Sequence, residues 1–243
     1  MKVLISQRPP LNLAAYQTLT EKYGVEIDFR PFFLIEPLSS REFRAERINI
    51  LDHTAIVFSN RHAIDAFFSL CESLRVQIPE TMKYFCTTEA VAMYLQKHIV
   101  YRKRKIFFGD GTPSSVIGLI GTKHAGERFL ITTSDSSTNT PITSLFDAKG
   151  LQYDTAVMVK SVSQDIKDLN LEDYAAVVLY NVADVKSLYE NFPDFKQGNV
   201  KFISFGKAIV NALEDAGLTI SVQAPTPEAP NAAKAIELFL KQQ

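Results

Sequence analysis

Short runs of apolar residues alternate along the chain with longer segments whose apolar positions recur at helical spacing. The runs are rich in β-branched and aromatic residues, and none alternates strictly, which predicts strands buried on both faces. In one helical segment, Ala63, Phe67, Leu70 and Leu74 form an apolar stripe. This alternation predicts parallel sheets with helices on both faces. The predicted strands are TAIVFS (54–59), KYFC (83–86), KIFF (105–108), RFLIT (128–132), AAVVLY (175–180), KFIS (201–204) and ISVQA (220–224).

The pattern occurs twice. The segment DHTAIVFSNRHAIDAFF (52–68) resembles DYAAVVLYNVADVKSLY (173–189), because each opens with Asp, continues through a strand-like run to Asn and then becomes helical. Likewise, KVLIS (2–6) resembles RFLIT (128–132). The repeat therefore predicts two α/β domains built on one plan, and by itself it would divide the chain near His124.

Charge and composition exclude several classes of function. The 243 residues carry a formal net charge of −1, whereas nucleic-acid-binding proteins have a basic excess. No apolar run is long enough to cross a bilayer. Cys71 and Cys86 have no metal-ligand spacing with each other or with the four histidines. We therefore expect two buried thiols in a reduced, cytoplasmic protein, with no metal, nucleic-acid or membrane partner.

Ligands of parallel α/β domains bind beyond the carboxyl ends of the strands, where helix N-termini offer free N–H groups to anions. The loops after the predicted strands are therefore candidate binding segments. Two facing domains would present two sets of such loops across a cleft. The loops are SQRPP (6–10), SNRH (59–62), CTTE (86–89), TTSDSSTNT (132–140), YNVAD (180–184) and FGKA (205–208). The candidate substrate-binding residues are Arg8, Ser59, Asn60, Thr87, Thr88, Thr133, Ser134, Asn181, Gly206 and Lys207.

These segments also admit simpler explanations. Ser59 and Asn60 could bind a carboxylate or only cap the helix that follows them. The hydroxyl-rich segment 132–140 could hold an anion or only be solvated. The basic run from Lys97 to Lys105 could steer an anionic ligand or be a solvated strand edge. No Ser-His-Asp, Cys-His or paired-carboxylate arrangement is recognisable, so no catalytic residue is assigned.

The stretch from Val200, VKFISFGKAIVNALEDAGLTISVQAPTPEAPNAAKAI, resembles the end of uroporphyrinogen-III synthases. That family shows a strand, a Gly, a helix ending in Leu-x-x-x-Gly, a strand ending in Ala and a Pro-Thr-Pro-like turn. The corresponding positions here are Gly206, Leu213, Gly217, Ala224 and 225–227. The opening VLISQRP and the segment 52–68 are also similar to family blocks, so the resemblance covers essentially the whole chain.

The resemblance implies two α/β domains, each a parallel sheet flanked by helices (flavodoxin-like), joined by a two-stranded connector at 30–35 and 157–164. One domain would be residues 1–34 plus 162–243, and the other would be residues 35–161. The implied activity is a lyase reaction that cyclises hydroxymethylbilane to uroporphyrinogen III, inverting the terminal pyrrole and releasing water. Such an enzyme positions a flexible octacarboxylate and supports developing positive charge. The resemblance further implies no cofactor, and a monomer whose partner is this linear tetrapyrrole substrate.

Several positions depart from the family pattern. The Tyr that the family commonly carries in its second connector, proposed to assist the leaving hydroxyl, corresponds here to Val159. Turn positions that hold Gly or a hydroxyl in the family hold Cys86, Glu89 and Ala208. These departures leave an alternative open, a non-catalytic or degenerate two-domain binder of an anionic small molecule. For an active enzyme, they predict that Val159→Tyr would raise the rate, provided that the connector directs the ring toward the cleft.

Overall fold

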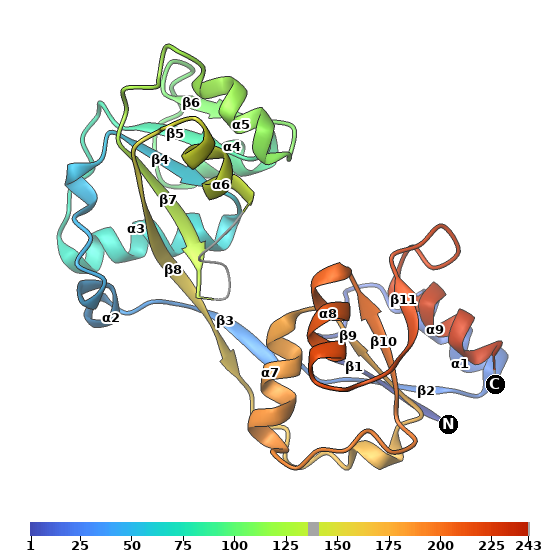
Figure 1. The fold of residues 1–243 in the computed structure, drawn as a ribbon. Helices are drawn as coiled ribbons and strands as arrows, with labels where there is room; N and C mark the ends of the chain where they lie inside the picture. The colour runs from blue at the N-terminus through green and yellow to red at the C-terminus, as the bar shows by residue number, and fades with distance from the viewer. Residues whose placement is uncertain (136–140, 243) are drawn as a thin grey trace. The chain divides into compact units, whose positions relative to one another are not determined.

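The computed structural model describes residues 1–135 and 141–242, which form two compact units (Figure 1). Unit 1 comprises Met1–Leu34 and Val162–Gln243, and unit 2 comprises Ile35–Ser161. Each unit is built on one β-sheet covered by helices. Among the described residues, every helix is too short or too polar to cross a membrane.

Unit 1 contains a five-stranded sheet in the order β11-β10-β9-β1-β2, with every neighbouring pair parallel. The central strand β9 is buried at all four positions, because helices cover both faces of the sheet. The strands are β1 (Lys2–Ile5), β2 (Glu26–Phe29), β9 (Ala176–Leu179), β10 (Lys201–Phe205) and β11 (Ile220–Ala224).

The helices of unit 1 divide its core into two layers. On one face, α7 and α8 pack over Leu4, Leu179 and Phe202. On the other face, α1 and α9, which lie side by side in Figure 1, pack over Ile5 and Ile203. The helices are α1 (Ala14–Tyr23), α7 (Val182–Asn191), α8 (Lys207–Asp215) and α9 (Ala232–Leu240), with a 3-10 turn, η3 (Leu171–Asp173).

Unit 2 contains the six-stranded sheet β3-β8-β7-β4-β5-β6, in which β8, β7, β4, β5 and β6 are parallel. Its strands are β3 (Phe33–Pro37), β4 (Ala55–Phe58), β5 (Lys83–Cys86), β6 (Ile106–Phe108), β7 (Phe129–Ser134) and β8 (Tyr153–Ser163). The chain passes between the units within β3 and within β8, which are neighbouring strands. This is the two-stranded connector, and the predicted fold class is confirmed.

Helices cover unit 2 on both faces as well. α2, α3 and α4 enclose one core layer with residues such as Phe58, Phe67 and Leu130. α5 and α6 enclose the other layer with Phe85 and Phe129. The helices are α2 (Ser40–Ala45), α3 (Arg61–Leu74), α4 (Glu89–Tyr94), α5 (Pro113–Ile120) and α6 (Pro141–Ala148), with 3-10 turns η1 (Ile50–Asp52) and η2 (Leu95–Lys97).

The two sheets have the same spatial order. The order β11-β10-β9-β1-β2 corresponds to the order β6-β5-β4-β7-β8. In this correspondence, β1 is equivalent to β7, β9 to β4 and β10 to β5. The internal repeat matched two of these pairs in sequence, β1 with β7 and β9 with β4. The chain visits the strands in a different order in each unit, however. For this reason, a division near His124, based on the repeat alone, does not separate the units.

Two sequence-based expectations need correction. The strand β11 alternates, with Ser221 and Gln223 exposed, because it is an edge strand with one solvated face. Val159 is only 5% exposed and belongs to the core of unit 2. A register shift opposite Thr133 and Ser134 interrupts β8 here, so that both Met158 and Val159 face the interior. A phenol at position 159 would therefore enter the core, and Val159→Tyr is not expected to raise the rate.

Candidate functional site

The carboxyl ends of β1, β9 and β10 lie at one edge of the sheet of unit 1, because these strands are parallel. The loops that leave this edge contain four of the predicted binding residues: Arg8, Asn181, Gly206 and Lys207. Arg8 and Lys207 are exposed, and neither forms an ion pair with another described residue. The edge at which α7 and α8 begin therefore also carries two cations, Arg8 and Lys207, that form no ion pair within the described residues.

Asn181 caps helix α7. Its side-chain oxygen accepts a hydrogen bond from the Ala183 N–H at 3.1 Å. In return, Asp184 Oδ2 accepts from the N–H groups of Tyr180 and Asn181, at 2.8 and 2.9 Å. This capping box fixes the backbone of the 180–181 turn, which leads from β9 into the helix. Sequence reasoning did not single out Asp184, although Asn followed three residues later by an acidic residue was the available signal.

Asp184 lies in a buried polar cluster. It is 1% exposed, and Ser6 and Ser204 are 3% and 0% exposed. Ser6 and Ser204 lie two residues after Leu4 and Phe202 and so share the sheet face that α7 covers. Asp184 Oδ1 and both serine hydroxyls make no hydrogen bond within the described part of the chain. The Ser6 hydroxyl lies close enough to favour the charged carboxylate without reaching hydrogen-bond geometry, but burial dominates and raises the pKa of Asp184 to about 6.

The start of helix α8 has no side-chain cap. Gly206 occupies the N-cap position with φ of 97°, a left-handed conformation that favours glycine. With no side chain to accept from the first turn, backbone N–H groups remain available to an anion. Lys207 is exposed at the first helical position. The arrangement suits a carboxylate that bonds the backbone and pairs with the ammonium group.

The carboxyl ends of β4 and β5 bring four more predicted residues together in unit 2. Asn60 Oδ1 caps α3 by accepting from the Ala63 N–H at 2.9 Å, and Thr88 caps α4 through the Val91 N–H at 3.3 Å. The Asn60 amide donates to Ser59 Oγ at 3.2 Å. The Thr87 hydroxyl donates to the carbonyl of Ser59, also at 3.2 Å. Capping is therefore one role of Asn60 and Thr88, and it leaves Ser59 Oγ accessible.

A small cavity of about 160 Å³ lies at this edge of unit 2. Ser59, Thr87 and Thr132 line it together with apolar residues of β4, β7, α5 and α6. The Thr132 hydroxyl donates to the Val57 carbonyl at 2.8 Å, so it is already satisfied. The Thr87 hydroxyl likewise donates to the Ser59 carbonyl, so the donor that the cavity offers beside its apolar wall is the Ser59 hydroxyl.

The third predicted loop of unit 2 is only partly described. Thr133 is 6% exposed and its hydroxyl has no hydrogen-bond partner among the described residues. Its side chain points into the protein and does not face solvent, contrary to the placement expected of a binding residue. Ser134 is half-buried at the end of β7 and takes part in an interaction of its own. The remainder of the hydroxyl-rich segment, residues 136–140, lies outside the described residues.

The groups that these edges present are N–H groups, hydroxyls and two cations, which are the groups that proteins use to hold anions. In residues 1–135 and 141–242, no group of three or more His, Cys, Asp or Glu side chains could hold a metal ion. Burial raises the pKa of both Cys71 and Cys86 to about 12, so neither thiol is activated. The sites are suited to holding a polycarboxylate ligand.

The two units, each a parallel-dominated sheet with helices on both faces and polar loops at the carboxyl ends of its strands, define a class of two-domain α/β proteins. A family model described as Uroporphyrinogen-III synthase HemD matches residues 14–234. The chain belongs to this family. No curated protein sequence matches it.

Solved structures agree with the fold. Uroporphyrinogen-III synthetase from Helicobacter pylori aligns with a TM-score of 0.60 at 16% identity, covering 100% of this chain and 99% of that chain. A mutant uroporphyrinogen III synthase from the extremely thermophilic bacterium Thermus thermophilus aligns with a TM-score of 0.54 at 15% identity, covering 100% and 98%. Identity this low supports the fold, while the family model supports the activity.

Family membership carries the reaction with it. The chain is a cyclising lyase of tetrapyrrole biosynthesis that converts hydroxymethylbilane to uroporphyrinogen III. Its substrate is a small-molecule tetrapyrrole. The alternative of a non-catalytic binder receives no support from these matches.

Proposed function

We propose that the loops at the carboxyl edges of the two sheets bind the carboxylates of hydroxymethylbilane. The observation that supports this most is that nine of the ten predicted residues lie at these edges with main-chain N–H groups or polar side chains near solvent. The nine residues are Arg8, Ser59, Asn60, Thr87, Thr88, Ser134, Asn181, Gly206 and Lys207. Thr133 is left out because it is buried.

Each unit contributes a different chemistry to binding. Unit 1 supplies positive charge, through Arg8, Lys207 and the uncapped start of α8. Unit 2 supplies a neutral donor, the hydroxyl of Ser59. Positive charge attracts the octacarboxylate, and the neutral donor orients it without placing further positive charge beside the cation that forms when the hydroxyl leaves.

Catalysis is then mainly positioning. A proton taken up from the solvent converts the hydroxyl to water as the C–O bond breaks, which leaves a cation that the pyrrole nitrogen stabilises. The fold must then bring the inverted terminal ring to that carbon. Holding both chain ends in one geometry replaces a search through many conformations. The set of carboxylate contacts therefore decides which isomer forms, and no single side chain is assigned as the acid.

The test uses hydroxymethylbilane and measures the ratio of uroporphyrinogen III to the I isomer. The wild-type protein should yield the III isomer. Lys207→Glu should raise KM by about tenfold, because it places a negative charge beside a polyanion. Lys201→Glu is the matched control, since Lys201 is exposed on the same strand-helix unit but at the amino end of β10. Equal effects of the two variants would remove Lys207 from the site.

We further propose that units 1 and 2 are folding domains with the bounds 1–34 plus 162–243 and 35–161. Each unit has a sheet with helices on both faces and separate core clusters, which supports this division. Limited proteolysis should cut first within the connector segments β3 and β8. Early cleavage inside β4 or β9 would contradict the division.

The chain is also proposed to be a cytoplasmic monomer. The free buried thiols of Cys71 and Cys86 suit a reducing compartment, and the monomeric state follows from the family resemblance. Light scattering should give the mass of one chain, 27.2 kDa. Cell fractionation should find the protein with cytoplasmic markers, and recovery with an extracytoplasmic marker would contradict this location.

A further inference from the structure

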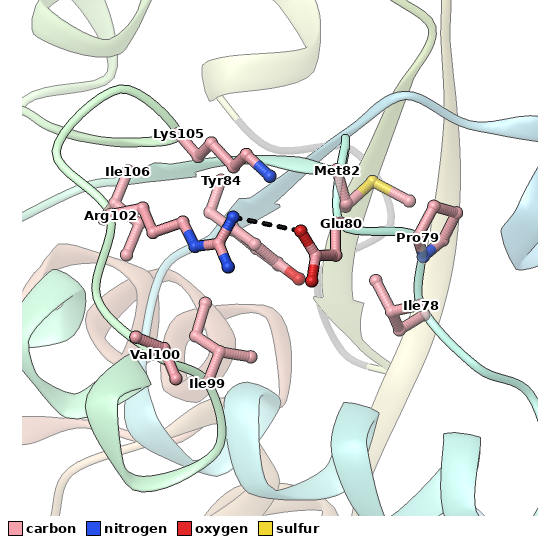
Figure 2. A pocket seen from close by; sticks show the side chains of 10 residues that line it. All are labelled: Ile78, Pro79, Glu80, Met82, Tyr84, Ile99, Val100, Arg102, Lys105 and Ile106. Atoms are coloured by element: carbon pink, nitrogen blue, oxygen red, sulfur yellow. Dashed lines mark hydrogen bonds and ion pairs between the residues drawn. The ribbon is translucent and has the colours of Figure 1, made fainter.

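A second cavity lies at the opposite edge of unit 2 from the proposed substrate loops. Figure 2 shows this pocket, which has a volume of about 230 Å³. Met82 immediately precedes β5, and Ile106 begins β6. The pocket is therefore at the amino ends of these parallel strands, whereas Ser59 and Thr87 follow the carboxyl ends of β4 and β5. It is a separate site in the same unit.

One wall of the pocket is apolar. Five aliphatic or thioether side chains line it: Ile78, Met82, Ile99, Val100 and Ile106. Val100 is 80% exposed, so part of this wall is open to solvent. A ligand that covered it would bury apolar surface and gain binding energy in proportion to the area removed from water.

The polar groups of the pocket leave hydrogen-bonding and charge capacity unused. Tyr84 is 5% exposed and lines the pocket, yet its hydroxyl makes no hydrogen bond with another described residue. Buried tyrosine hydroxyls usually have a partner. Burial raises the pKa of Tyr84 to about 12, so the hydroxyl remains a proton donor at neutral pH. The hydroxyl is not among the enclosed polar atoms, so it is open to the pocket and can donate to a ligand there.

Two cations reach the pocket from one segment. Figure 2 shows Arg102 and Lys105 extending over it, with Arg102 bonded to Glu80 across the opening at 3.0 Å. That ion pair is exposed on both sides, 51% and 80%, and such pairs contribute little. Lys105 is half-buried and has no ion-pair partner in the described part of the chain. The lining therefore carries one net positive charge, from two cations and Glu80.

We propose that this pocket binds a small amphipathic monocarboxylate, with its apolar body against the aliphatic wall and its carboxylate accepting from Tyr84 beside Lys105 and Arg102. An amine would be repelled by the lining, and an uncharged molecule would leave Lys105 unpaired. The volume lies below the range of about 300–1,000 Å³ of sites for drug-sized ligands. The ligand is therefore about the size of a phenyl-substituted acid, and the tetrapyrrole substrate is too large.

The direct test is an NMR titration of the ¹⁵N-labelled full chain with phenylacetate. Shift changes should concentrate in segments 78–84 and 99–106. Phenylacetamide has the same shape without the charge and should bind roughly five- to tenfold more weakly, and phenethylamine more weakly still. Equal affinity for the acid and the amide, or shifts elsewhere in the chain only, would overturn the proposal.

Variants separate the two polar contributions. Lys105→Met keeps most of the aliphatic stem and should weaken phenylacetate binding by roughly five- to tenfold, without affecting phenylacetamide. Tyr84→Phe keeps the buried ring and should weaken the acid by roughly threefold or more. Lys103→Met is the control, because Lys103 is exposed on the same segment and does not line the pocket. If Lys103→Met lowered the phenylacetate affinity as much as Lys105→Met, the effect would come from the net charge of the segment, and the proposed site would be contradicted.

Discussion

The two units share one order of strands, but they differ in the residues buried under the helix that follows the central strand. In unit 1, Ser6, Asp184 and Ser204 lie under the first turn of the helix that follows the central strand. By strand register and helix position, the equivalent residues of unit 2 are Thr132, Ala63 and Cys86. Thr132 bonds a strand carbonyl, and Ala63 and Cys86 are buried apolar residues. Unit 1 therefore has unpaired polar atoms at these positions, whereas unit 2 has a hydrogen-bonded threonine and two apolar residues.

The comparison shows that this fold does not require the polar cluster. A buried polar atom without a hydrogen bond costs about 1–3 kcal/mol, and unit 2 avoids that cost with Ala63 and Cys86. What unit 1 gains is a carboxylate that holds the N–H groups of Tyr180 and Asn181. Through these two bonds, Asp184 positions the backbone of the Asn181 turn, which is one of the loops of the proposed binding site.

The largest expected effect is on pH dependence. Burial raises the pKa of Asp184 to about 6 from 3.8, so the folded state holds this proton more tightly than the unfolded state. Its contribution to the free energy of unfolding therefore falls as the pH rises from about 4 to about 6, by up to about 3 kcal/mol. Urea denaturation across this range should show the fall in the wild type and lose it in Asp184→Asn.

The control for that measurement is Asp215→Asn, which changes an exposed aspartate of the same unit. It should keep the wild-type slope between pH 4 and pH 6. An unchanged slope in Asp184→Asn would mean that Asp184 is ionised throughout this range. The polar cluster of unit 1 would then differ from the equivalent positions of unit 2 in its residue types, without an effect on the pH dependence of stability. A change in KM for Asp184→Asn with little change in melting temperature would support the positioning role.

The next effect concerns β8, which continues to Ser163, whereas its counterpart β2 ends at Phe29. Val159 is packed in the core of unit 2, so Val159→Tyr should lower the free energy of unfolding by about 1–3 kcal/mol through overpacking. Val159→Ile is a milder control. Thermal unfolding gives the stability, and a coupled cyclisation assay gives the rate. A faster enzyme with unchanged stability would show that the side chain at 159 is not confined to the core.

The smallest effect comes from exchanging one equivalent pair. Cys86→Ser places the hydroxyl of unit 1 in the apolar position of unit 2 and should destabilise by about 1–2 kcal/mol. Ser204→Cys removes an unpartnered hydroxyl from unit 1 and should be neutral or stabilising by up to about 1 kcal/mol. Urea denaturation measures both. Destabilisation by Ser204→Cys would indicate that the Ser204 hydroxyl has a partner such as a bound water.

Most of the fold was predictable because its strongest signals are local and repeated. Apolar runs bounded by polar turns identified β4, β9 and β10, and the repeat matched strands that occupy equivalent positions. The strand β2 was not predicted, since Glu26 and Asp28 interrupt its apolar pattern at the sheet edge. The exchange of strands between the units was accessible only through the family resemblance, because it leaves no periodic signal.

The candidate site was predictable as a set of loops, but the directions of its side chains were not. Parallel strands place Asn60, Thr87 and Asn181 at carboxyl edges whatever the details of packing. The direction of Thr133 and Val159 depends on a register shift between β7 and β8, which no local pattern records. The protonation of Asp184 depends on its burial by residues distant in sequence.

The insertion of unit 2 within unit 1 sets an order of events during synthesis. β1 pairs with β9, matching Val3 with Ala176, so its central partner leaves the ribosome only after all of unit 2. Chains stalled just after residue 161 has left the ribosome should already protect unit 2 from protease while β1 remains cleavable. Protection of β1 at that stage would contradict this order. Once folded, unit 2 brings residues 35 and 161 close together on neighbouring strands, which shortens the effective loop that β1 must close. The segment 162–243, which is made last, thus meets its partner strand β1 already tethered to it through folded unit 2.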